Sequence, residues 1–83
     1  MNKDIVIKLK LEDEDHCKYC PECDTDDVIF FITHLIKRDD KIISEYGYCS
    51  ECNAPVVSHD EVSNYWHIGK EAKEIYNKYY IIK

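Results

Sequence analysis

The chain has 83 residues and a formal net charge of −6, from 17 acidic and 11 basic side chains. A domain this small buries only about 60–65% of its unfolded surface and usually needs a staple, so we expect a single zinc-binding domain over residues 1–83. The acidic balance and the single arginine argue against a nucleic-acid partner, and no apolar run approaches the roughly 20 residues of a membrane span.

The first predicted element is a strand over residues 3–11. Isoleucine and leucine occupy its odd positions from Ile5 to Leu11, and Lys8 and Lys10 lie between them. This period of two predicts a half-buried strand, and the lysines are typical of a sheet edge.

An acidic stretch, Glu12–Asp15, follows the strand. Residues 1–27 hold nine acids against four lysines, so the negative charge is concentrated near the N-terminus. We interpret the stretch as a solvated loop, with a docking surface for a basic partner as the alternative.

Two pairs of cysteines form the strongest motif, because each pair is separated by two residues. Four thiolates at this spacing can surround one Zn²⁺ ion, whereas Ca²⁺ and Mg²⁺ prefer oxygen ligands. We therefore predict a zinc site. Its predicted ligands are Cys20, Cys23, Cys49 and Cys52.

Cys17 offers an alternative to this ligand set, since Cys17, Cys20 and Cys23 are equally spaced. We favour Cys20 with Cys23, because Pro21 presets a turn and has no N–H to leave unpaired. Cys17 is then expected to be a small apolar residue beside the site. The odd number of cysteines and the absence of a signal peptide favour a reduced, cytoplasmic metal site over disulfides.

A hairpin is predicted between the two pairs, within the zinc-clamped segment 20–52. Residues 28–36 and 41–48 are rich in β-branched and aromatic side chains and flank a polar break. A two-residue turn at Asp39-Asp40 would place His34, interpreted as a histidine on the polar face, opposite Glu45. Residues 53–57 would then form an edge strand or an extended link, since Pro55 argues against a central strand.

The predicted C-terminal element is an amphipathic helix over about residues 59–80. Ser58 and Glu61 fit a capping box, and apolar residues recur from Val62 to Tyr80 at steps of three and four. Gly69 falls on this stripe and either breaks the helix or lets it approach the sheet closely.

The aromatic residues of this segment are expected to pack on the sheet, with some left exposed for a partner or a homodimer. His59 and His67 are expected to be surface or cap residues.

The order Cys-Pro-x-Cys, hairpin, Tyr-Cys-x-x-Cys and helix resembles a zinc ribbon, and more closely the zinc domain of MqsA-like (YgiT-type) antitoxins. The resemblance implies an α+β fold with a small antiparallel sheet of about three strands, a structural zinc and a surface that holds a protein partner. Asp24 and Asn53 depart from it, because such knuckles often carry glycine there. The chain has no room for the family's DNA-binding helix-turn-helix.

The expected function is a non-enzymatic, zinc-stabilised protein-binding module with a regulatory or antitoxin-like role and a basic partner. Four cysteine ligands leave no coordination position for water or substrate. The alternative is a nucleic-acid-binding zinc ribbon linked to transcription or RNA handling, which the charge disfavours.

Overall fold

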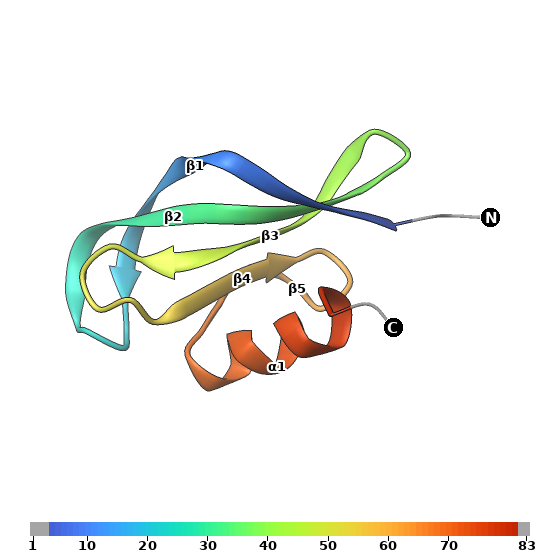
Figure 1. The fold of residues 1–83 in the computed structure, drawn as a ribbon. Helices are drawn as coiled ribbons and strands as arrows, with labels where there is room; N and C mark the ends of the chain where they lie inside the picture. The colour runs from blue at the N-terminus through green and yellow to red at the C-terminus, as the bar shows by residue number, and fades with distance from the viewer. Residues whose placement is uncertain (1–3, 82–83) are drawn as a thin grey trace.

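The computed structural model describes residues 4–81, apart from the side chains of residues 17, 18, 63 and 64. Five strands precede one helix. They are β1 (Asp4–Cys20), β2 (Thr25–Arg38), β3 (Lys41–Cys49), β4 (Pro55–His59), β5 (Ser63–Ile68) and α1 (Lys70–Tyr79). All pairings are antiparallel, and the strands lie in the sheet in chain order (Figure 1).

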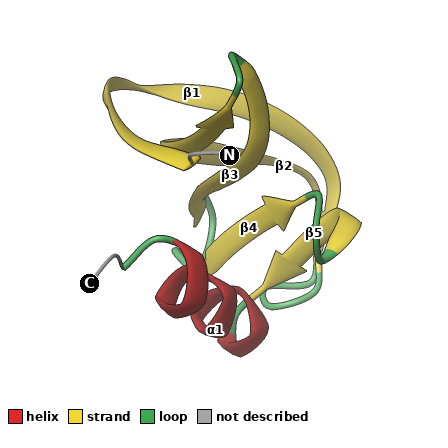
Figure 2. Ribbon diagram, turned by 90° about the vertical axis from the view of Figure 1, so that its right-hand side faces the viewer, coloured by secondary structure: helices red, strands yellow, loops and turns green. Residues whose placement is uncertain are grey.

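The helix covers one side of the strongly twisted sheet, where it packs on β4 and β5 (Figure 2). Tyr80 directly follows the helix and packs there with Ile36, Val57 and Ile75. A second apolar cluster forms around Phe30. The rings of Phe30 and Trp66 meet edge to face, with their centroids 5.2 Å apart. The neighbours Val56 and Val57 belong to different clusters, as expected for a strand buried on both faces.

The expected three-stranded ribbon is therefore wrong. The sheet has five strands: β5 arises where a helix was predicted, and β4 is an inner strand where an edge strand or an extended link was predicted. Pro55 begins β4, which lies between β3 and β5, so it is not in an edge strand. A proline is tolerated at the first residue of a strand.

The predicted helix begins too early. Residues 63–68 form β5, and α1 begins only at Lys70. Ser58 lies in β4, so the predicted capping box does not exist. Gly69 lies between β5 and α1 with φ of 80°, a conformation that favours glycine. Of the two roles considered for Gly69, it therefore interrupts the predicted helix.

The first strand is an edge strand, as predicted, but it continues through the acidic stretch to Cys20. Asp13 pairs with Ile32 and Glu14 with Phe31, so these residues are not in a loop. The pairing is interrupted between Lys8 and Asp13, where β1 bends.

The predicted hairpin is present, with Asp39 and Asp40 at positive φ in a two-residue turn between β2 and β3. The register shifts twice along it, between Ile32 and His34 and again between Ile36 and Lys37. Between these irregularities His34 faces Tyr46 instead of Glu45. His34 is half-buried beside the ring of Tyr76, so it is not on a polar face.

Candidate metal centre

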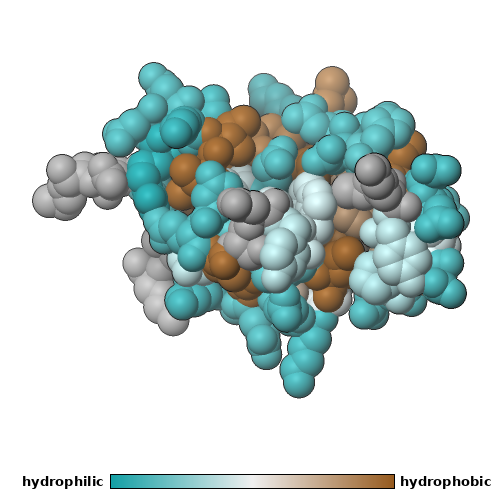
Figure 3. Space-filling model, turned by 180° about the vertical axis from the view of Figure 1, so that it is seen from behind, coloured by the Kyte–Doolittle hydropathy of each residue, from teal (hydrophilic) through white to brown (hydrophobic). Residues whose placement is uncertain are grey.

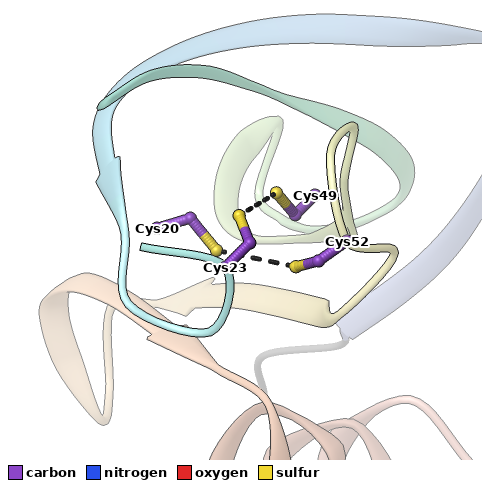
Figure 4. A group of neighbouring side chains, drawn as sticks. All are labelled: Cys20, Cys23, Cys49 and Cys52. Carbon is purple, nitrogen blue, oxygen red and sulfur yellow. Dashed lines mark hydrogen bonds between the residues drawn. The ribbon is translucent and has the colours of Figure 1, made fainter. Parts of the chain in front are cut away.

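The four predicted cysteine ligands come together at one end of the sheet, from the β1–β2 and β3–β4 connections (Figure 4). Cys20 ends β1 and Cys49 ends β3, whereas Cys23 and Cys52 lie in the turns that follow. The N–H of Ser50 donates to the carbonyl of Ile29 at 2.9 Å, which fixes the second turn to β2. The sheet therefore positions both halves of the site.

The sulfur positions match a tetrahedral ion. All four Sγ atoms lie within 4.8 Å of one another. The Sγ atoms of Cys20 and Cys52 are 3.8 Å apart, as are those of Cys23 and Cys49. A Zn–S bond of about 2.3 Å gives about 3.8 Å between sulfur atoms in a regular tetrahedron, whereas a disulfide needs about 2.05 Å. The cluster is thus compatible with a metal ion held by four thiolates.

Each turn ends on a residue with left-handed backbone geometry. Asp24 has φ of 53° and Asn53 has φ of 62°, and each directly follows the second cysteine of its pair. Aspartate and asparagine tolerate this region better than most residues, so the missing glycines do not prevent the turns. The hydroxyl of Tyr19 donates to the carboxylate of Asp24 at 2.5 Å and holds the first turn.

The thiols differ in their acidity. Burial raises the pKa of the Cys20 thiol to about 12 and raises the pKa of the Cys52 thiol as well. Hydrogen bonding from Thr25 lowers the pKa of Cys23. Because a metal binds thiolates, metal binding must release protons from these thiols and should be weaker at low pH.

The alternative ligand, Cys17, lies in β1 opposite Val28, and its side chain is outside the described part of the structure. Within the described residues, the four-cysteine cluster is complete without it.

His59 and His67 lie away from this cluster and are not surface residues. They are 0% and 7% exposed, and their Nε2 atoms have no hydrogen-bond partner among the described residues. His59 stacks on Tyr79, and Nδ1 of His67 contacts the carboxylate of Glu71. Burial lowers the pKa of His59. Both are packing residues of the helix-covered side.

Glu22 is a residue of the centre that the sequence reasoning missed. Its side chain comes from the first cysteine turn and lies against Gly69, at the N-terminus of α1. A Cβ atom added to Gly69 would lie 3.0 Å from Oε2 of Glu22. A carboxylate is favourable at the N-terminus of a helix, so the turn that carries Cys20 and Cys23 also stabilises the start of α1. In the sequence, Gly69 was the one residue that could have indicated a close contact at this position.

No helix within residues 4–81 is both long enough and apolar enough to cross a membrane.

Comparisons with protein-family models, with curated proteins and with solved structures found no match. The resemblance to MqsA-like antitoxins therefore rests on the cysteine motifs and stays a prediction.

Proposed function

We propose that this chain is a non-enzymatic module that binds a basic protein and whose zinc ion stabilises the fold. The observation that carries the proposal is the acidic stretch, which is displayed on a strand. Glu12, Asp13 and Glu14 are exposed side chains of β1. The backbone of Asp13 and Glu14 is paired with β2, and the carboxylate of Glu12 accepts a hydrogen bond from Tyr48, so the backbone of this stretch needs little ordering when a partner binds.

Zinc is the metal that fits the proposal. Four sulfur ligands suit Zn²⁺ and leave no open coordination position, which is the arrangement of structural zinc sites. The formal charge of −6 becomes −8 when four thiolates and one Zn²⁺ are counted. A colourless protein with one zinc per chain is expected, and iron in the site would overturn this part of the proposal.

The negative charge extends beyond β1. Glu45 is half-buried on β3, and its pKa is raised by burial and then by the nearby Asp15, Asp13 and Asp60. Within the described residues, none of these four carboxylates forms an ion pair. A basic protein surface would relieve this repulsion, and its approach would be steered by a field that salt weakens.

The alternative of nucleic-acid binding gains no support from the single arginine. Nε of Arg38 lies 2.6 Å from the carboxylate of Asp4, and Nη1 lies 2.5 Å from that of Glu61. The guanidinium is occupied by two carboxylates and is not free to contact phosphate.

A matched pair of charge reversals tests the proposal. Glu14→Lys alters the acidic stretch, and Glu74→Lys makes the same charge change on an exposed position of α1. Zinc-loaded proteins are used to capture partners from a lysate, and the recovered partner is titrated at low and high salt. Glu14→Lys should weaken binding at least about tenfold more than Glu74→Lys. Equal losses, or an affinity that salt leaves unchanged, would refute the acidic surface as the contact.

A further inference from the structure

The outer edge of β1 is a long row of backbone groups to which no strand of the described chain is paired. β1 has 17 residues and lies at one end of the strand order. An unpaired edge offers N–H and C=O groups to any extended chain of suitable composition.

The pairing of β1 with β2 is interrupted at the bend of β1. The pairing jumps from Lys8 with His34 to Asp13 with Ile32, so residues 9–12 have only Thr33 opposite them. Leu11 lies in this segment and is 84% exposed, the highest value among the large exposed apolar side chains of the described residues. The segment thus presents backbone groups and an apolar side chain together.

The acidic side chains along the edge favour a positively charged partner. Glu12 is held in place because its carboxylate accepts a hydrogen bond from the hydroxyl of Tyr48 at 2.8 Å. Within the described residues, no ion pair neutralises Glu12, Asp13, Glu14 or Asp15. Figure 3 shows apolar areas interspersed with hydrophilic side chains on the face that it draws.

We propose that an extended, basic segment of a partner protein adds to β1 as a sixth strand. Its lysine or arginine side chains lie opposite Glu12–Asp15, and an apolar side chain packs on Leu11. This inference rests on the proposed function and specifies how the partner binds. A second copy of the chain is the weaker occupant, because two molecules of charge −6 repel each other.

Strand addition depends on backbone hydrogen bonds, which distinguishes it from attraction between charged surfaces. A short peptide that alternates lysine with valine is the probe, and the same peptide N-methylated at alternate amides is its matched control. Both carry equal charge, but the control cannot donate along one edge. Fluorescence anisotropy at low salt should show about tenfold tighter binding of the unmethylated peptide, as expected for the loss of about two hydrogen bonds.

A variant of the chain gives an independent measurement. Leu11→Pro removes one N–H from the segment that has no continuous pairing to β2, and Leu11→Ala removes the side chain alone. Zinc content and thermal unfolding are measured first, to check that both variants fold. Leu11→Pro should lose most of the preference for the unmethylated peptide, whereas Leu11→Ala should retain it.

The remaining outcomes separate this inference from the proposed function. Equal binding of the two peptides would overturn strand addition and leave an acidic binding surface intact. Failure of both peptides at low salt would also overturn strand addition, and partner capture that still depends on Glu14 would then leave the acidic surface of β1 as the contact. A dimer of the free protein in sedimentation that Leu11→Pro dissociates would identify a second copy as the occupant and overturn the proposal.

Discussion

Gly47 lies at a point where β2 and β3 approach too closely for any side chain. It pairs with Ile32, next to the first register shift of the hairpin. A Cβ atom at Gly47 would lie 1.9 Å from the carbonyl oxygen of Phe31 and 2.9 Å from Cα of Ile32. Ordinary contacts of a Cβ atom begin at about 3.4 Å, so the strands must separate by about 1.5 Å.

Both obstructing atoms belong to the backbone, and no rotamer change can relieve the contact. Gly47→Ala must therefore break hydrogen bonds in the centre of the hairpin, each worth about 0.5–1.5 kcal/mol, and disturb packing as well. We expect a loss of about 3–5 kcal/mol from a total that is about 4–12 kcal/mol for a chain of this length.

Gly69→Ala is the matched comparison. It places alanine at φ of 80° and ψ of −132°, a sparsely populated conformation that costs about 1–3 kcal/mol, and its Cβ meets the carboxylate of Glu22, the end of a flexible side chain. Urea unfolding of the zinc-loaded variants in excess zinc measures both losses. A loss for Gly47→Ala that is equal to or smaller than that for Gly69→Ala would refute the reasoning.

Three further predictions concern the metal, a buried histidine and a buried hydroxyl. Cys23→Ser should lose most of the bound zinc and Cys17→Ser should keep one zinc per chain, as measured by atomic emission; the reverse would exchange their roles. Burial lowers the pKa of His59, so its stabilising effect is complete above the unfolded pKa of about 6.5 and is lost as pH falls through and below it. His59→Phe should flatten the fall of melting temperature between about pH 7 and 5, and an unchanged slope would contradict this. Tyr80→Phe removes the partner that Ser44 has at 2.5 Å and should cost about 1–2 kcal/mol in urea unfolding; a loss near zero would show that Ser44 finds another partner.

The metal cluster could be predicted from the sequence because its chemistry is local. Two cysteines with two residues between them define a turn, and the two-residue turn at Asp39-Asp40 is local in the same sense. The hairpin between them follows directly. The pairing of His34 could not be predicted, since it depends on Thr33 and Ile43, residues that fall at irregularities in opposite strands.

The error in the helix has a different physical cause. Trp66 and Ile68 pack on one side of β5, and His67 packs on the other, so both faces of this strand are occupied. Aromatic rings on both faces, with Tyr65 stacked on His67 on one and Trp66 on the other, removed the alternation that identifies a half-buried strand, and the remaining pattern matched a helical step. Only packing against Phe30 and the helix decides the outcome.

The strand order has a consequence for the chain during its synthesis. Because each strand pairs with the next one in the sequence, sheet formation can follow translation from β1 onward. The metal centre cannot form in this stepwise way, since Cys23 and Cys49 are 26 residues apart in the sequence. At about 5–20 residues per second, the first pair of thiols waits about 1–5 s for the second. During that interval the nascent chain carries the free thiols of Cys17, Cys20 and Cys23, and incomplete metal binding leaves them open to oxidation.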